Sequence, residues 1–286
     1  MGFYAPAQLV RDAREHGVEI RPMDVNHSNW ETTLEPIDNS SRYAVRLGLH
    51  MVSGLFEKEA RALVEARGAG YRTPAEIARR AGCSRRALDR LAQADAFSSM
   101  TLGRRQALWK TSALDGKIPP LFTGADLFDE PEANLPSPTA SQEVLADYLA
   151  AGLTLREHPL TFLRSRLKGK QVITAAELKK TPAGKTVLVA GLVLFRQHPQ
   201  TAKETIFLTI EDETGAANLI VWKHVHIKHH DAVYRGKLLA CRGVVQREGQ
   251  VLHVVARHVW DWSSLLKQLD PQHGTPALPV RSRDFR

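Results

Sequence analysis

Hydrophobic residues recur along this chain with two different periods. Before about residue 115 they follow helical spacing, as at Phe56, Ala60, Leu63 and Val64. After residue 185 they form short apolar runs that are typical of strands. Five strands are predicted, near 186–196, 205–211, 216–222, 237–247 and 251–260. A helical insertion, KHVHIKHHDAVY, lies between the third strand and the fourth. The pattern therefore predicts an α+β multidomain chain with a helical first half and a C-terminal β-barrel or sandwich.

A different composition separates these two regions. The stretch IPPLFTGADLFDEPEANLPSPT is rich in proline and acidic residues, which is typical of a connector. A short helix is expected after Ser141, in QEVLADYLAAG. We therefore predict five parts along the chain: 1–40, a helical region 41–115, a connector 116–184, a β domain 185–262 and a tail 263–286.

Composition narrows the class of protein. The 286 residues are 43% hydrophobic and 24% charged, as in globular proteins. No apolar run approaches the roughly 20 residues of a membrane span, and the first residues lack a signal-peptide core. Only Cys83 and Cys241 are present, which argues against a disulfide framework or a cysteine zinc finger. We expect a soluble, cytoplasmic and nucleoid-associated protein.

The net charge of +8 is unevenly distributed. Residues 1–40 carry a net −4 and residues 119–160 a net −6, whereas residues 41–118 carry +8 and residues 161–184 carry +5. A basic excess favours a polyanionic partner. Its concentration in the helical region indicates where such a partner would bind.

A glycine turn precedes the first amphipathic helix of that basic region. In Val52-Ser53-Gly54-Leu55, backbone N–H groups can approach a phosphate closely, and the helix that follows adds its positive dipole end. This is the hairpin of a helix-hairpin-helix motif, which contacts the nucleic-acid backbone rather than the bases. The predicted contacts are Ser53, Gly54, Leu55, Lys58 and Arg61.

A second turn of the same kind is predicted downstream. Thr73 and Glu76 form a capping box with Pro74 at the first helical position, and this helix is expected to stop at Gly82. Ser84 then caps the next helix. An ordinary glycine-stopped bundle with solvated arginines is the alternative interpretation. The predicted DNA contacts of this second turn are Gly82, Ser84, Arg85 and Arg86, with Arg79, Arg80 and Arg90 nearby.

The β domain has the strand order of an OB-fold barrel, a fold that often binds oligonucleotides. Single-strand binding requires aromatic faces for base stacking and cations along a groove. For any single aromatic residue, we favour packing in the barrel interior over base stacking, so the basic residues are the stronger candidates. The candidate contacts are Phe207 and Trp222, with Phe195 as a further ring, and Arg196, Lys203, Lys223 and Arg247.

Two clusters resemble metal sites, but we predict no metal and no catalytic residue in this chain. Residues 211–215 are a carboxylate-rich hairpin tip without an enclosing cavity. His226 and His230 are four residues apart and would share a helix face, but no cysteine is near to complete a closed zinc site. A solvated histidine face is the alternative that we favour.

Nearly the whole chain resembles bacterial family C DNA polymerases, in colinear order. GFYAPAQLVRDAREHGVEIRPMDVNHSNW is similar to the end of their fingers region, and GLHMVSGLFEKEARALVEARG and TPAEIARRAGCSRRALDRLAQADAF to their tandem helix-hairpin-helix region. DYLAAGLTLREHPLTFLR resembles their connector, with Thr154 in place of a serine. AGLVLFRQHPQTAKETIFLTIEDETGAANLIVW resembles their OB domain and is similar to the error-prone branch.

This resemblance implies the C-terminal, DNA-binding part of an error-prone polymerase that acts in damage-induced mutagenesis, translesion synthesis and repair. Residues 1–40 would be a remnant of the fingers domain, the hairpins would hold primer–template duplex, and the OB barrel would hold single-stranded template. The family uses Mg²⁺ in a palm domain, for which no Asp-x-Asp pair occurs here. We therefore expect no cofactor in this chain and no polymerisation by it alone.

Some alternatives remain open at this stage. The chain could be a truncated reading frame, one with a misplaced start, or a separately encoded piece. It could also be an autonomous single-strand or tRNA-binding module, or a relic with protein contacts only. The resemblance further implies sliding clamp and other mutagenesis-complex proteins as candidate partners, with Leu127 and Phe128 at the position of a clamp-binding peptide that lacks its usual glutamine. Plain linker hydrophobes are the alternative for those two residues.

Overall fold

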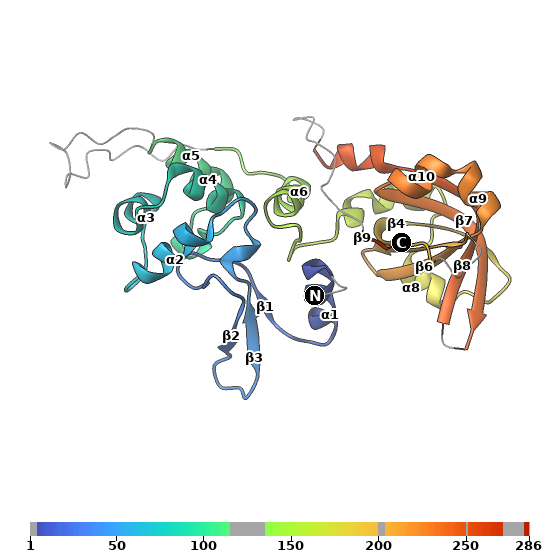
Figure 1. Cartoon of the computed structure of the whole chain (residues 1–286), viewed down its shortest axis with the longest axis horizontal. Helices are drawn as coiled ribbons and strands as arrows, with labels where there is room; N and C mark the ends of the chain where they lie inside the picture. The colour runs from blue at the N-terminus through green and yellow to red at the C-terminus, as the bar shows by residue number, and fades with distance from the viewer. Residues whose placement is uncertain (1–4, 115–134, 200–203, 250, 271–282, 286) are drawn as a thin grey trace. The chain divides into compact units, whose positions relative to one another are not determined.

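The computed structural model describes residues 5–114, 135–199, 204–249, 251–270 and 283–285. The chain divides into two compact units, Met1–Leu155 and Arg156–Arg286 (Figure 1). Among the residues described, no helix is long and apolar enough to cross a membrane. The first unit is mainly helical and the second is built around a β-barrel, which confirms the predicted fold class.

The predicted caps define the helices of the first unit. Thr73 Oγ1 accepts a hydrogen bond from the Glu76 amide, and Gly82 ends the helix in the left-handed conformation. The helix predicted after Ser141 begins earlier, because Thr139 provides its capping box. The elements are α1 Pro6–Glu15, β1 Ile20–Arg21, β2 Thr33–Pro36, β3 Tyr43–Arg46, η1 Leu49–Met51, α2 Glu57–Glu65, α3 Pro74–Ala81, α4 Arg85–Gln93, η2 Ser98–Met100, α5 Arg104–Ser112 and α6 Ala140–Ala151.

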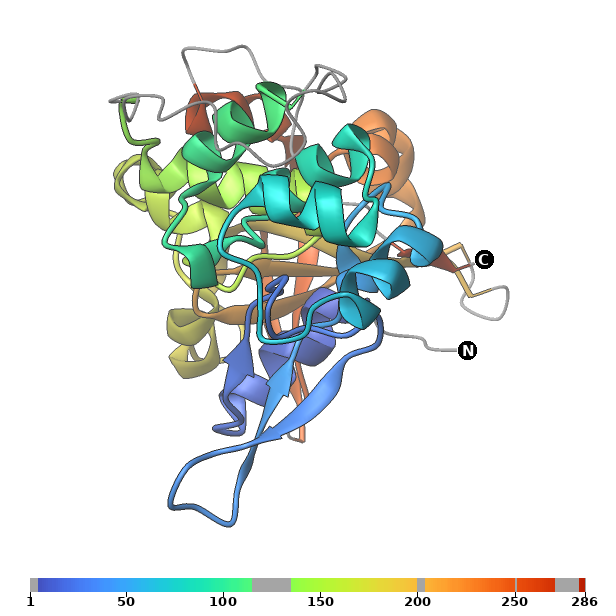
Figure 2. The same ribbon diagram turned by 90° about the vertical axis from the view of Figure 1, so that its left-hand side faces the viewer.

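Residues 20–46 contain a small sheet, which the helical spacing does not predict. Its strands lie in the order β1-β3-β2, and the β2–β3 hairpin extends away from the helices (Figure 2). Strands of two to four residues are too short to show an alternation, so their only local signal is β-branched and aromatic residues. The first half is therefore not purely helical.

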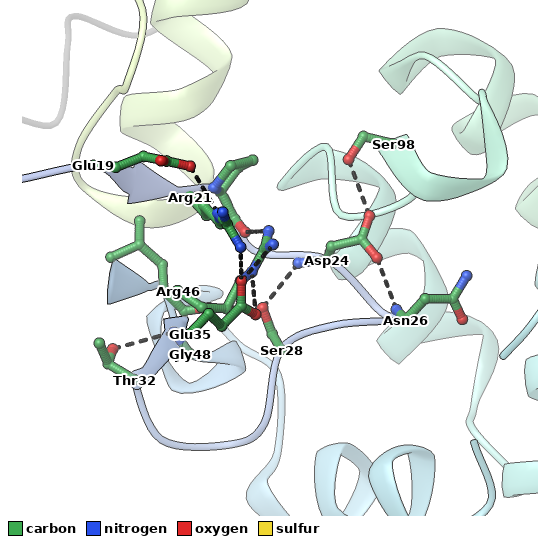
Figure 3. A network of polar contacts seen from close by, with 12 residues as sticks. Glu19, Arg21, Asp24, Asn26, Ser28, Thr32, Glu35, Arg46, Gly48 and Ser98 are labelled. Atoms are coloured by element: carbon green, nitrogen blue, oxygen red, sulfur yellow. Dashed lines mark hydrogen bonds and ion pairs between the residues drawn. The ribbon is translucent and has the colours of Figure 1, made fainter. Parts of the chain in front are cut away.

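A polar network joins this sheet to the helices (Figure 3). Glu35 accepts hydrogen bonds from Arg21 and Arg46, which holds β1, β2 and β3 together. The buried Asp24 accepts from the Ser98 hydroxyl at 3.0 Å and from the Ser99 amide at 2.9 Å, at the start of η2. The sheet and the helical core therefore form one unit.

The core of the first unit lies among α2, α3, α4 and α5. Its largest fully buried side chains include Leu63, Ile77, Leu88 and Phe97. The connector helix α6 belongs to this unit, because the buried Arg104 of α5 pairs with its Asp147 and Glu143. Apolar residues at helical spacing account for this core.

The second unit is a closed five-stranded barrel followed by a short edge strand. Pairing runs β5-β6-β8-β7-β4, and β4 pairs again with β5 to close the barrel. The five predicted strands and the helical insertion are confirmed. The elements are η4 Pro159–Leu163, α7 Arg164–Gly169, α8 Ala175–Lys180, β4 Thr186–Gln197, β5 Ile206–Asp212, β6 Gly215–Val221, α9 Lys223–Lys228, α10 His230–Arg235, β7 Leu238–Glu248, β8 Val251–Asp261, η5 Ser263–Leu269 and β9 Arg283–Phe285, which pairs with β4.

The acidic hairpin tip between β5 and β6 anchors α7 and α8 to the barrel. Asp212 accepts a hydrogen bond from the Ala175 amide at 2.8 Å, and Arg164 pairs with Asp212 and Glu213. Thr214 Oγ1 accepts from the Ala176 amide at 3.0 Å. The carboxylates of this tip thus serve the packing of the connector on the barrel.

Candidate nucleic-acid interface

The first turn, residues 52–55, leaves backbone amides open to an acceptor. Its two apolar residues, Val52 and Leu55, are buried and anchor it, while Gly54 has φ +78°. Phe56 is the N-cap residue of α2 and provides no side-chain cap. Within the described part of the chain, no acceptor is found for the amides of Gly54, Phe56, Glu57 and Lys58. Such a group of amides at a helix start is suited to a phosphate.

Cations from two helices surround this turn. Lys58 is exposed in the first turn of α2. The Arg86 guanidinium of α4 lies over the ring of Phe56, with 5.1 Å from Cζ to the ring centroid, and that Phe is 56% exposed. Arg90, also of α4, lies so close that a Cβ on Gly54 would come within 3.3 Å of its Nε. The first turn therefore combines open amides with positive charge.

The predicted contact Arg61 is engaged with a neighbouring carboxylate. Its guanidinium lies 2.6 Å from Glu57 Oε1, one helical turn before it. Both side chains are exposed, so the pair is weak and a phosphate could compete for Arg61. Ser53 contributes less than predicted, because its amide already donates to Ala150 O at 2.7 Å.

At the second turn, residues 81–84, protein groups use one of the backbone amides. Gly82 has φ +63°, and Ser84 Oγ accepts a hydrogen bond from the Ala87 amide. The Ser84 amide itself donates to Glu59 Oε1 of α2 at 3.0 Å. An internal carboxylate thus occupies the side of the turn where a phosphate oxygen would accept the same hydrogen bond. Both turns place a glycine two residues before the N-cap residue of a helix. The Ser84 amide is used, whereas the amides of Gly82, Cys83 and Arg86 have no acceptor in the described part of the chain, as at the first turn.

Several arginines near the second turn serve the fold. Arg80 donates to the carbonyls of Ala66, Arg67 and Gly70 and lies over the Tyr71 ring at 4.6 Å, so it stabilises the loop after α2. Arg85 lies 3.5 Å from Asp89. Arg79 is exposed. The basic residues that the sequence groups together thus have different environments.

The outer face of the barrel carries an apolar row across three strands. Leu208, Leu219 and Val254 lie in the core, so their neighbours in sequence face outward. Strand pairing aligns Phe207 with Ile220 and Ile220 with Val255, and all three are half-buried. We call Phe207, Ile220 and Val255 the outer row. The two predicted rings are therefore outside the barrel, since Trp222 is 46% exposed.

The predicted basic contacts of the barrel have unequal surroundings. Lys223 is exposed and forms an ion pair with Glu204, whose pKa is lowered mainly by that hydrogen bond. Arg247 is exposed and donates to Lys179 O at 2.9 Å. Lys203 lies outside the described residues. Lys223 and Arg247 thus remain accessible to a partner.

The expectation that Arg196 lies on the basic rim is wrong. It is 8% exposed, and its Nε donates to Val233 O at 2.7 Å while another nitrogen donates to Gly236 O. These carbonyls end α10, so the arginine caps that helix from inside the barrel. A β-bulge in β4 between Val193 and Phe195 disturbs the alternation that places Arg196 outside.

Two exposed arginines on the outer face were not predicted. Arg242 of β7 and Arg257 of β8 have no hydrogen-bond or ion-pair partner within the described residues. Val254 and Ala256 are buried, and successive side chains of a strand point to opposite faces. This alternation predicts that the next residue, Arg257, faces outward. Arg242 stands opposite His258, next to a register shift, so sequence alternation alone places it poorly.

The histidine cluster is divided by the structure. His226 lies in α9, and its Nε2 donates to Glu204 O at 2.9 Å, whereas His230 begins α10. The backbone breaks at His229, so the expected shared helix face does not form. Among the described residues, no three His, Cys, Asp or Glu side chains are placed to hold a metal ion. Leu127 and Phe128 lie outside the described residues.

Comparisons with known proteins agree with both halves of this geometry. The family described as "Helix-hairpin-helix motif" matches residues 17–107, and the family described as "OB-fold nucleic acid binding domain" matches residues 187–261. Error-prone DNA polymerase 2 of Rhizobium meliloti is 45% identical over 99% of this chain and 27% of its own length. Error-prone DNA polymerase of Caulobacter vibrioides is 45% identical over 99% of this chain and 28% of its own length.

The chain spans about a quarter of the length of the curated relatives that it matches. Both nucleic-acid-binding families match within it, one in each structural unit. Over nearly all of its length, this chain is a homologue of a segment of the bacterial error-prone DNA polymerases.

Proposed function

We propose that this chain is the DNA-holding segment of an error-prone DNA polymerase. The first turn binds the backbone of the primer–template duplex, and the outer face of the barrel binds the single-stranded template. The observation that carries the proposal is the group of open amides at Gly54, Phe56, Glu57 and Lys58, beside Arg86 and Arg90, in a chain 45% identical to such polymerases.

Backbone contacts make this binding independent of sequence. Amides and guanidinium groups read phosphates, and stacking rings read the faces of all bases alike. Such a segment tolerates any template, which suits synthesis across damaged DNA in mutagenesis and repair. The polymerisation chemistry belongs to carboxylates outside this chain, since no paired aspartates occur in it.

The experiment is a salt titration of binding. Log K for a primer–template should fall linearly with log salt, by about 0.9 per duplex phosphate and 0.7 per single-strand phosphate that is neutralised. Affinity should not depend on template sequence. A flat salt dependence, or binding to RNA in preference to DNA, would contradict the proposal. Primer extension by this chain with dNTPs and Mg²⁺ would contradict the absence of catalysis.

Contact with the sliding clamp is a separate part of the proposal. Leu127 and Phe128 in the acidic connector are the residues that would enter a hydrophobic pocket of the clamp. Pull-down by the clamp should be lost in Leu127→Ala/Phe128→Ala. Equal capture of this variant and the wild type would refute the contact.

A further inference from the structure

Four cations gather at the end of the barrel where the connector joins it. Lys179 and Lys180 end α8, and Lys185 lies just before β4. Arg247 lies near the end of β7, and all four side chains are exposed. Backbone contacts bring these segments together, because Lys185 O accepts from the Val245 amide at 2.9 Å and Arg247 donates to Lys179 O at 2.9 Å. We call Lys179, Lys180, Lys185 and Arg247 the basic corner.

The fold neutralises another cation of the connector but not these four. Arg164 of α7 pairs with Asp212 and Glu213 at the tip between β5 and β6. The three lysines of the basic corner form no ion pair within the described part of the chain, and Arg247 donates to a neutral carbonyl. The charge of the basic corner therefore has no structural partner among the residues described.

The carboxylates that follow or precede the basic corner in sequence are engaged within their own segments. Glu177 accepts hydrogen bonds from the amide of Thr174 at 2.7 Å and from its hydroxyl at 3.0 Å, at the start of α8. Glu248 accepts from Gln246 Nε2 at 3.0 Å, on the strand that carries Arg247. Four clustered positive charges attract a polyanion.

The exposed tryptophans and tyrosine of the described part of the barrel unit lie at its other end. Trp222 follows β6, Tyr234 lies in α10 before β7 begins, and Trp260 pairs near the start of β7. The basic corner lies instead where β6 begins and β7 ends, since a Cβ on Gly215 would come within 3.8 Å of Lys179 Nζ. Binding of single strands uses rings for stacking, whereas a duplex backbone can be held by cations alone. The basic corner therefore suits a duplex.

We propose that the basic corner binds the phosphate backbone of duplex DNA. The barrel unit then contacts both forms of DNA, with rings for the single strand at one end and cations for the duplex at the other. This role adds to the proposed function, on which it rests, because there the first turn alone holds the duplex. The connector contributes three of the four cations and is more than a spacer between the two units.

The experiment compares two triple variants of the full chain. Lys179→Ala/Lys180→Ala/Lys185→Ala removes the lysines of the basic corner. The control, Lys110→Ala/Lys228→Ala/Lys267→Ala, removes three exposed lysines from other elements and changes the net charge equally. In a salt titration with a blunt duplex, the slope of log K should fall in the first variant by about 2.7, which is about 0.9 for each phosphate that loses its cation. The control should keep the wild-type slope.

A single variant separates binding from helix stability. Lys179 and Lys180 lie in the last turn of α8, where a cation also stabilises the helix, so unfolding curves accompany the titrations. Lys185 lies outside every helix and strand, and Lys185→Ala alone should lower the duplex slope by about 0.9 without changing stability.

The outcomes separate this proposal from the proposed function. Equal duplex slopes in the wild type, the basic-corner variant and Lys185→Ala would overturn the basic corner, and so would an equal fall in the control. A fall confined to single-stranded DNA would also overturn it, because the occupant would then be the single strand. If the wild-type chain itself shows no salt-dependent duplex binding, the proposed function fails as well.

Discussion

The helical unit and the barrel offer nucleic acid two different kinds of surface. In the helical unit, the first turn has open backbone amides, and cations converge on it from α4. The barrel has a sheet face that carries the outer row and the exposed Trp222, Arg242 and Arg257. The first arrangement is suited to a phosphate at one point, whereas an extended sheet face is suited to a strand of several nucleotides.

This difference shows that local sequence similarity does not measure availability. Both glycine turns place a glycine two residues before a helix N-cap, but the amide of the N-cap residue Ser84 is used by Glu59, whereas that of Phe56 is open. Likewise, Arg196 and Arg257 both lie on strands of one barrel, and only Arg257 is exposed. In both cases a neighbouring element decides whether the group serves the fold or remains for a partner.

The largest effect is expected from an alanine at the first turn. Gly54 and Gly82 both have positive φ, so Gly54→Ala and Gly82→Ala should each destabilise the helical unit by about 1–2 kcal/mol. Only Gly54→Ala should also weaken duplex binding by tenfold or more, because its Cβ meets Arg90 beside the open amides. Thermal unfolding and duplex titration measure the two effects. Equal losses of binding would remove the distinction between the turns.

The next effect concerns stacking on the barrel. Trp222→Ala should weaken single-stranded DNA binding by about tenfold, since one base–aromatic stack contributes about 1–3 kcal/mol, and should leave duplex binding unchanged. Trp109, an exposed tryptophan of α5, provides the control. Fluorescence anisotropy with an oligonucleotide measures both variants. A loss with Trp109→Ala as large as with Trp222→Ala would argue against the outer face.

A smaller effect separates exposed from buried arginines. Arg242→Ala/Arg257→Ala should reduce the salt slope of single-strand binding by about 1.4, the value for two single-strand phosphates, without changing barrel stability. Arg196→Ala should have the opposite profile, because two carbonyls at the end of α10 lose their donor. Salt titration and chemical unfolding distinguish the two. A reduced slope with Arg196→Ala would restore its predicted role at the rim.

The smallest effect is a different pH dependence of the two units. Burial, followed by His258 and Lys228, lowers the pKa of His229, so protonation favours the unfolded barrel. The contribution of His229 is complete above about pH 6.5 and is lost as the pH falls through its folded pKa.

In the helical unit, hydrogen bonds from Arg46 and Arg21 lower the pKa of Glu35 to about 2. Its contribution is complete above about pH 4.5 and is lost as the pH falls towards 2. Hydrogen exchange between pH 7 and 4 should therefore show the barrel weakening first. His229→Gln should remove the loss near neutral pH, and an unchanged profile in that variant would contradict the assignment.

Much of the fold could be predicted from the sequence because its signals are local. Helices are specified locally by the capping residues Thr73 and Ser84 and by the stop at Gly82. The period of the apolar residues separates helices from strands, again without reference to distant parts of the chain. The small sheet of residues 20–46 could not be predicted in this way, because its strands are too short to show a period and depend on pairing between separate segments.

The sequence by itself determined the two kinds of unit, the position of the turns and the basic excess of the helical region. Only the tertiary structure decided which of these groups remain available. Glu59 and Ser84 are 25 residues apart, and Arg196 and Val233 are 37 apart. Hydrogen bonds across such separations exist only after folding brings the elements together, so they leave no local pattern in the chain.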